Sequence, residues 1–240
     1  TYYIRLVDEL TDDNYVVTLA SSAGSGNTVL YSITQRRVTI SFTGGTNVIY
    51  GNNVDENALR DLIAFSRTNG SGDAFLGKDS AVQADVLAAL NFNLGGYTVT
   101  SNAGSTFNIT ISGMDSVGSA SNYTFAYSDA EAELTVDKRP ITFAIASKLN
   151  LTYGTDAVWE ASESLSAELT SGTFANGHNA GNVYTLGVYD EDGTLITGGW
   201  NSLAVGDYFI VGTAINNNYA VTFTGDADYK DGTDNAGTFE

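Results

Sequence analysis

The order of apolar and polar residues predicts short β-strands that alternate with polar turns. Apolar side chains take alternate positions after each of three Asn-Tyr steps, Asn14-Tyr15, Asn122-Tyr123 and Asn218-Tyr219. Such alternation places one face of a strand on a core, and asparagine tolerates the left-handed backbone of a tight turn. Further strands are expected at 107–111, 183–189 and 206–211. The pattern therefore predicts an all-β fold.

Two segments depart from this pattern. In 55–65, Leu59, Leu62 and Ile63 fall on one helical face behind an acidic first turn, although the part from Ala58 to Phe65 also fits a strand. Asp79-Ser80 before the apolar run 81–90 predicts a second, capped helix. In the last third of the chain, an Asp-Gly step between the runs 183–189 and 195–196 predicts a hairpin.

Two distant stretches share the same landmarks. Arg36-Arg37 leads through an apolar strand to Tyr50-Gly51, and Lys138-Arg139 leads through a similar strand to Tyr153-Gly154. The offset is 139 − 37 = 102 at the basic pair and 153 − 50 = 103 at Tyr-Gly. A constant offset at separate landmarks indicates a tandem repeat. We therefore divide the chain into 1–36, the last strands of a preceding module, and two full modules, 37–138 and 139–240.

The module junctions concentrate positive charge. Four of the 10 Lys and Arg residues lie there, namely Arg36, Arg37, Lys138 and Arg139. The single proline, Pro140, fixes its own φ and favours an extended Arg139. No Gly/Ser spacer separates the modules, so we expect a short, stiff connection in which these cations face carboxylates of adjacent modules. The alternative is that they are edge-strand charges that prevent mispairing.

Composition excludes several functional classes. The chain has no cysteine, which excludes disulfides and thiolate sites and, for an extracellular protein, suggests a bacterial origin. A net charge of −18 disfavours nucleic acid and anionic membranes as partners. No apolar run is long enough to cross a membrane.

Together these motifs resemble the MBG/YDG-type repeats, bacterial Ig-like modules of large surface adhesins. In the middle module the matching residues are Tyr50-Gly51, Gly96-Tyr97, Asn122-Tyr123 and Leu134-Thr135-Val136. In the last module they are Tyr153-Gly154, Gly206-Asp207-Tyr208, Asn218-Tyr219 and Phe223. The resemblance covers 37–225 in outline. It implies tandem Ig-like antiparallel β-sandwiches, with one or two short helices in the middle module, at an extracellular or cell-surface location. The helical segment 55–90 and the polar segment 225–235 depart from the family pattern.

Calcium is the one cofactor that the residue pattern favours. Asp226, Asp228, Asp231 and Asp234 occupy near-alternate positions around Gly232, and carboxylate oxygens are the ligands that Ca²⁺ takes. A second acidic turn, 190–192, is a weaker candidate. The single histidine, His178, is expected to be a solvated loop residue, because no catalytic partner can be assigned to it. The recurrent tyrosines are expected to pack in the core with hydrogen-bonded hydroxyls.

The sequence thus predicts a non-enzymatic repeat region of a bacterial cell-surface or secreted adhesin, whose stiff modules add reach. An alternative is a subunit of a self-assembling extracellular fibre or sheath. In that case the surplus strands of 1–36 and the weak final strand of 226–240 pair between neighbouring copies. A third hypothesis, based on aromatic content, is a glycan-binding module. The expected partners are neighbouring modules, other copies of the chain, or a surface glycan or protein.

Overall fold

The computed structural model describes residues 2–5, 28–31, 33–68, 70–113, 122–145, 165–197, 203–225 and 236–239. The strands in chain order are β1 (Tyr2–Arg5), β2 (Thr28–Tyr31), β3 (Arg36–Phe42), β4 (Thr46–Ile49), β5 (Ile63–Arg67), β6 (Asn91–Asn93), β7 (Thr106–Ser112), β8 (Tyr123–Tyr127), β9 (Glu131–Asp137), β10 (Arg139–Ile145), β11 (Ala167–Gly172), β12 (Tyr184–Asp190), β13 (Tyr208–Ala214), β14 (Tyr219–Thr224) and β15 (Ala236–Phe239). The described ranges also contain helices α1 (Glu56–Asp61) and α2 (Ser80–Ala89) and the 3₁₀ turns η1 (Gly77–Asp79) and η4 (Ala180–Asn182). The fold is therefore mostly β, as the alternation predicts.

The chain divides into two compact units. The first consists of Thr1–Ser41, Ile63–Asn91 and Ser112–Ala130, and the second of Phe42–Leu62, Phe92–Ile111 and Glu131–Glu240. The second unit thus joins part of 37–138 to the whole of 139–240. The module boundaries at 36/37 and 138/139 follow from the sequence period and remain a prediction.

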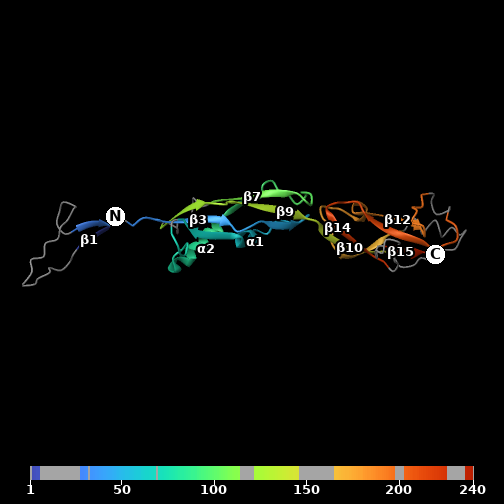
Figure 1. The fold of residues 1–240 in the computed structure, drawn as a ribbon, viewed down its shortest axis with the longest axis horizontal. Helices are drawn as coiled ribbons and strands as arrows, with labels where there is room; N and C mark the ends of the chain where they lie inside the picture. The colour runs from blue at the N-terminus through green and yellow to red at the C-terminus, as the bar shows by residue number, and fades with distance from the viewer. Residues whose placement is uncertain are drawn as a thin grey trace, which may run out of the picture. The chain divides into compact units, whose positions relative to one another are not determined.

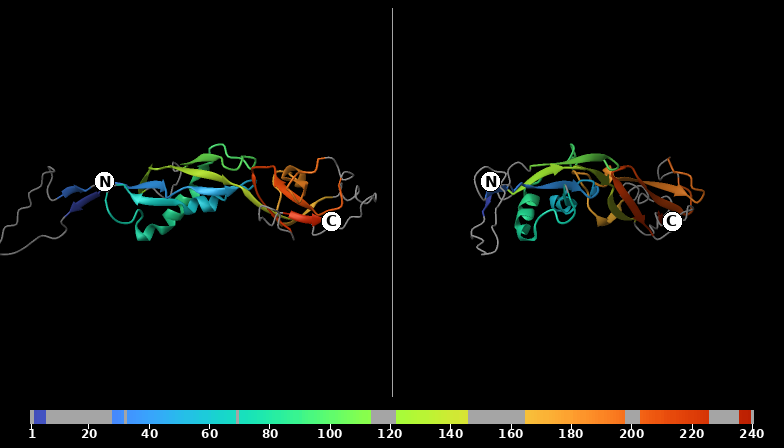
Figure 2. Two further views of the ribbon diagram at one scale, coloured as in Figure 1. Left: turned by 45° about the vertical axis from the view of Figure 1, so that its right-hand side comes forward. Right: turned by 60° about the vertical axis from the view of Figure 1, so that its left-hand side comes forward.

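The sheets are small. In the first unit β3 lies between β5 and β8, and β1 pairs with β2 in an antiparallel ribbon, drawn in two shades of blue near the N label in Figure 2. The second unit contains most of the sheet β4-β9-β7-β6 and the sheets β11-β10-β14 and β12-β13-β15. Figure 1 shows β7 and β9 side by side, where they pair in antiparallel fashion.

Three of these sheets contain a parallel pair, so the expectation of purely antiparallel sheets is wrong. β3 pairs in parallel with β8, β4 with β9, and β10 with β14. A parallel pair requires a long connection between its strands. Each of these pairs joins segments far apart in the sequence, which is why the order of neighbouring strands alone did not predict it.

β3 and β10 are structural counterparts. Residue by residue, both strands have the same alternation of buried and partly exposed positions, from Arg36 and Arg139 onwards. Arg36 pairs with Tyr123 and Arg139 with Tyr219. The structural offset is therefore 139 − 36 = 103, which equals the offset between the two Tyr-Gly steps. The match of Arg37 to Arg139, with an offset of 102, is wrong by one residue, because the Arg-Arg and Lys-Arg pairs occupy different registers.

Aromatic side chains fill the core of each unit. In the second unit, Phe143 of β10 contacts the rings of Tyr184 and Phe223, at centroid distances of 4.5 and 6.0 Å. In the first unit, Phe75 contacts Phe65 and Tyr123, at 5.2 and 5.0 Å. Burial of such rings supplies much of the driving force for folding.

Both expected helices are present, with corrections. Asp55 caps α1 through a hydrogen bond from the Asn57 N–H, and the helix ends at Asp61. The next residues form β5, so helix and strand each account for part of 55–67. Asp79 makes no capping hydrogen bond to α2, which corrects the expectation of a capped helix. Its carboxylate instead accepts a hydrogen bond from the Tyr123 hydroxyl, at 2.6 Å. Asp79 therefore makes a tertiary contact in place of a helix cap.

The predicted hairpin is confirmed in its main features. After β12, the Gly193 N–H donates to the Asp190 carbonyl, and the Ile196 N–H donates to the Val188 carbonyl at 2.8 Å. Gly193 has φ +79, a conformation that glycine adopts without strain. Leu195 returns as a bridge to Tyr189.

The last strand corrects another expectation. β15, at Ala236–Phe239, pairs antiparallel with β13, so the final segment does supply a strand to its sheet. Asn14-Tyr15 and Tyr153-Gly154 lie outside the described residues.

Candidate functional site

A cluster of four residues lies at the start of β10, and we call it the second cluster: Arg139, Ala175, His178 and Tyr219. The Tyr219 hydroxyl accepts a hydrogen bond from the Ala175 N–H at 3.0 Å. It also lies 3.1 Å from Nδ1 of His178. Tyr219 is buried, so its hydroxyl needs these partners, which confirms the expectation of hydrogen-bonded core tyrosines here.

Arg139 joins this cluster to the Tyr50-Gly51-Asn52 turn. Its Nε donates to the Tyr50 carbonyl at 2.9 Å, and Nη2 donates to Oδ1 of Asn52. Nη1 donates to Oγ1 of Thr173 at 3.0 Å. A planar guanidinium with donors on several edges can hold three such groups in one geometry. One side chain therefore ties the end of β4 to the loop after β11, all within the second unit.

Close packing accompanies these hydrogen bonds. A Cβ atom on Gly51 would lie 2.3 Å from the Cβ of Ala175, so only glycine allows the turn to come this near. The Tyr50 ring meets the Tyr219 ring edge-on at 5.7 Å. Asn218 adds a further link, because its Oδ1 accepts the Ala103 N–H at 2.8 Å and its Nδ2 donates to Asn102.

His178 is not a solvated loop residue, which corrects that expectation. Its ring stacks on Tyr50, with centroids 6.2 Å apart and planes at 28°. It also contacts Tyr219, and its side chain is half-buried. The loop composition around it did not reveal this, because Tyr50 lies far away in the sequence.

The first cluster, Arg36, Leu76, Asp79 and Tyr123, repeats this arrangement in the first unit. The Tyr123 hydroxyl accepts the Leu76 N–H at 3.1 Å and donates to Asp79. The offsets agree: 175 − 76 = 99 and 178 − 79 = 99. Asp79 thus stands where the second cluster has His178. The Arg36 N–H donates to the Asn122 carbonyl at 2.9 Å, as the Arg139 N–H does to the Asn218 carbonyl at 3.0 Å.

Arg36 differs from Arg139 in its acceptors. Its Nε donates to the Ala74 carbonyl at 2.8 Å, and Nη2 donates to the Asp73 carbonyl. Both carbonyls belong to the loop between β5 and η1, in the same unit as Arg36. In the described residues, the hydrogen bonds of the Arg36 and Arg139 side chains go to groups other than carboxylates. Carbonyl, amide and hydroxyl oxygens accept the hydrogen bonds that these two side chains donate. The expectation that junction cations face carboxylates of adjacent modules stays a prediction, since much of the segment before Arg36 lies outside the described residues.

The other junction residues are more exposed. Arg37, Lys138 and Pro140 all lie at the surface. Arg139 and Pro140 are the first two residues of β10, which confirms that Arg139 is extended. Pairing with β11 begins only at Ile141, so Pro140 lies at the end of the strand, where a residue that donates no hydrogen bond is tolerated.

Burial raises the pKa of the Tyr123 phenol above its ordinary value of 10.0. The hydrogen bond that it donates to Asp79 acts in the same direction, because it requires the protonated hydroxyl. Tyr123 therefore stays neutral, and its proton is part of the first cluster.

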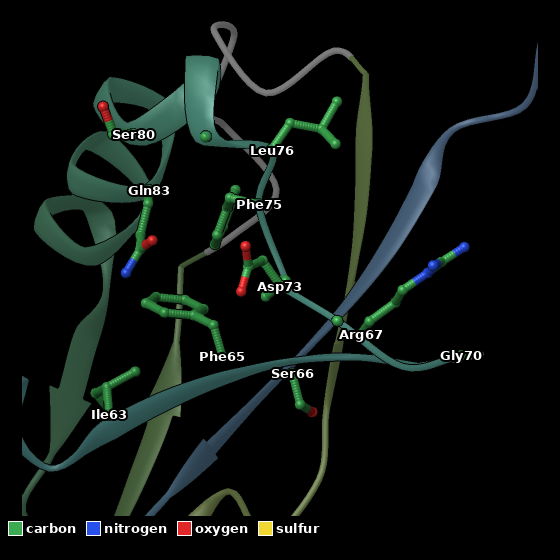
Figure 3. A pocket seen from close by; sticks show the side chains of 13 residues that line it. Ile63, Phe65, Ser66, Arg67, Gly70, Asp73, Phe75, Leu76, Ser80 and Gln83 are labelled. Carbon is green, nitrogen blue, oxygen red and sulfur yellow. The ribbon is translucent and has the colours of Figure 1, made fainter.

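An open pocket of about 630 Å³ lies in the first unit, between β5, the following loop and the start of α2. Phe65 and Phe75 contribute its aromatic walls, and Asp73 and Gln83 point into the same space, whereas Arg67 points away (Figure 3). Sequence analysis missed this pocket, because its residues have no characteristic spacing.

The calcium candidates Asp226, Asp228, Asp231 and Asp234 lie outside the described residues. In the described ranges, no three His, Asp or Glu side chains converge as a metal site would require. Asp190 of the second acidic turn has a structural role instead, because its Oδ1 accepts the Thr194 N–H at 2.7 Å.

Comparison with known proteins gives no relative. No protein-family model matches the chain, and no curated protein matches it. Among the described residues, none of the helices has the length and apolar character needed to cross a membrane.

Proposed function

We propose that this chain is a non-enzymatic repeat region of a bacterial cell-surface or secreted adhesin, composed of Ig-like β-sandwich modules that act as a stiff extracellular stalk. The observation that carries this proposal is the Arg139 bridge. It links the Tyr50-Gly51-Asn52 turn of 37–138 to the 165–225 part of the next module. A stalk needs such contacts, because a connection without them leaves the modules free to rotate.

Other features support the same role. The first and second clusters share one set of contacts, and their corresponding residues lie 96 to 103 positions apart (219 − 123 = 96 and 139 − 36 = 103), as expected for similar modules that are added one after another. Charge-assisted hydrogen bonds from arginine are stronger than neutral ones and are directional. The strong negative charge keeps such a chain soluble and separate from its neighbours.

The alternative of a self-assembling fibre or sheath has less support. It rested on surplus strands in 1–36 and on a weak final strand in 226–240, and at that end β15 pairs with β13. Size-exclusion chromatography with light scattering tests it directly. A monodisperse monomer at high concentration removes the fibre, and concentration-dependent polymers would replace the stalk proposal with it.

Stiffness is tested by the distance between two spin labels on either side of Lys138. The chain contains no cysteine, so Glu133→Cys and Glu168→Cys, both at exposed strand positions, can be labelled without further changes. We expect a narrow distance distribution in the parent chain and a broad one after Arg139→Gln. Lys138→Gln is the matched control, because that neighbouring cation is exposed, and it should leave the distribution narrow. A broad distribution in the parent chain contradicts the stalk.

A further inference from the structure

Two apolar side chains, one in the first cluster and one just before it, are exposed. Leu76 is 44% exposed, whereas its counterpart Ala175 is 7% exposed. Ile33, three residues before Arg36, is 69% exposed, whereas Val136, three residues before Arg139, is 1% exposed. In both pairs of corresponding residues, the side chain in the first unit is more exposed than its counterpart in the second.

The second unit shows what covers the buried counterparts. Val136 of β9 pairs with Val48 of β4 in a parallel ladder. The chain continues from β4 directly into Tyr50-Gly51, and Gly51 packs on Ala175. One continuous segment, an apolar strand followed by a Tyr-Gly-Asn turn, therefore covers both positions.

In the part of the chain that the structure describes, the strand before the first cluster is paired on one side. β9 has two neighbours, β7 on one side and β4 on the other. β2, 103 residues before the corresponding part of β9, pairs within the described residues with β1 alone. The β1–β2 pair is antiparallel, like β7–β9, so the place that stays open corresponds to that of β4.

We infer that Ile33, Arg36 and Leu76 form the docking surface for the β4-like strand and Tyr-Gly-Asn turn of a preceding repeat of the same kind. The inference rests on the proposed function and extends it to a specific partner. Arg36 is placed like Arg139, and its Nε, bound to the Ala74 carbonyl, is the group that would pass to the carbonyl of the arriving tyrosine. Asp79 in place of His178 offers that tyrosine no ring to stack on, so this junction is the weaker of the two.

Counting back 103 residues from Thr46 puts this segment ahead of Thr1, so the test supplies it by duplication. Residues 34–136 are repeated once after Val136 in the full chain, which keeps the register because Val136 corresponds to Ile33. The second copy of the first cluster then follows a complete repeat. A single Leu76→Cys substitution reports coverage through the rate of thiol alkylation.

We expect the cysteine in the second copy to react more slowly than in the parent chain, on the order of tenfold, because alkylation then requires local opening. The same substitution in the first copy is the matched control and should react at the parent rate. Tyr50→Ala or the milder Asn52→Ala, placed in the first copy, should restore fast alkylation in the second. Equal rates in the two copies would overturn the inference, and so would protection that survives both turn variants.

The spin-label experiment separates this inference from the proposed function. A broad distance distribution across Lys138 together with a protected second-copy cysteine removes the stalk and keeps the docking surface. A narrow distribution with an unprotected cysteine removes only the docking surface.

Discussion

The first and second clusters share a framework but differ in their surroundings. In each, a tyrosine hydroxyl accepts a loop N–H, and an arginine begins the strand beside that tyrosine. In the second cluster the arginine also reaches the Tyr50-Gly51-Asn52 turn, and the packed residue is the small Ala175. In the first cluster the arginine donates to the loop between β5 and η1, and the larger Leu76 is exposed.

This difference separates two roles that the sequence motif combines. The tyrosine and its N–H donor hold the loop against the sheet within one repeat. The hydrogen-bond acceptors of the arginine, and the exposure of the residue at the 76/175 position, depend on which other segments lie beside them. Substitutions at the shared and the differing positions should therefore have distinct effects.

The largest effect is expected in the core beneath the clusters. Phe143→Ala should destabilise the protein by about 3–5 kcal/mol, because it leaves a cavity among aromatic rings. Ile40→Ala, at the equivalent position of β3, removes a smaller side chain and should cost less. Urea unfolding followed by circular dichroism measures both. A larger loss for Ile40→Ala would contradict the equivalence of the two cores.

Gly51→Ala should have the next largest effect. Gly51 has φ +83, and its added Cβ would overlap Ala175. The backbone strain costs about 1–2 kcal/mol and the overlap about 1–3 kcal/mol more. Gly177→Ala is the matched control, because Gly177 has φ +74 but open space around its Cβ, and it should show the strain alone. Equal free energies of unfolding for the two variants would show that the turn does not press on Ala175.

Tyr123→Phe should destabilise the first cluster by about 1–3 kcal/mol near neutral pH, because the part-buried Leu76 N–H loses its acceptor and Asp79 loses its donor. The folded-state pKa of Tyr123 lies above 10.0, so its contribution is complete below pH 10. It is lost as the pH rises through the folded-state pKa, because the unfolded chain releases the phenolic proton first.

The pH dependence gives this substitution a second readout. Above pH 10 the free energy of unfolding should fall more steeply in the parent chain than in Tyr123→Phe, as measured by urea unfolding at several pH values. Parallel curves would show that the Tyr123 proton is not linked to folding.

Leu76→Ala should have the smallest effect, within about 0.5 kcal/mol, because exposed side chains contribute little to stability. The melting temperature is a sufficient measurement. A loss comparable to that of a core substitution would mean that Leu76 is already covered in this chain, and would contradict the docking surface.

Part of this structure could be predicted from local pattern. Alternation located β7, β8 and β14, and the Asp-Gly step located the turn after β12, because period and turn chemistry act over a few residues. The helix that became α2 was also visible as an apolar run. The role of Asp79 was missed, because its sequence position suits a helix cap while its carboxylate is engaged by a tyrosine 44 residues away.

Other features depend on contacts between distant segments. The Arg-Arg and Lys-Arg pairs suggested an offset of 102, but only strand pairing showed that Arg36 and Arg139 correspond. His178 lies in a loop by composition, and its contact with Tyr50 crosses 128 residues, 178 − 50 = 128. The pocket between β5 and α2 has no sequence signature at all.

By itself, the sequence determined many of the strand-forming segments and the placement of glycine and asparagine at turns, since these follow from short-range backbone preference and side-chain period. Tertiary structure alone decided the parallel pairings, the acceptors of Arg36 and Arg139 and the unequal exposure of Leu76 and Ala175. The physical reason is that a hydrogen bond or an apolar contact depends on which groups are brought together. The two clusters therefore differ in the groups that the surrounding segments bring to them.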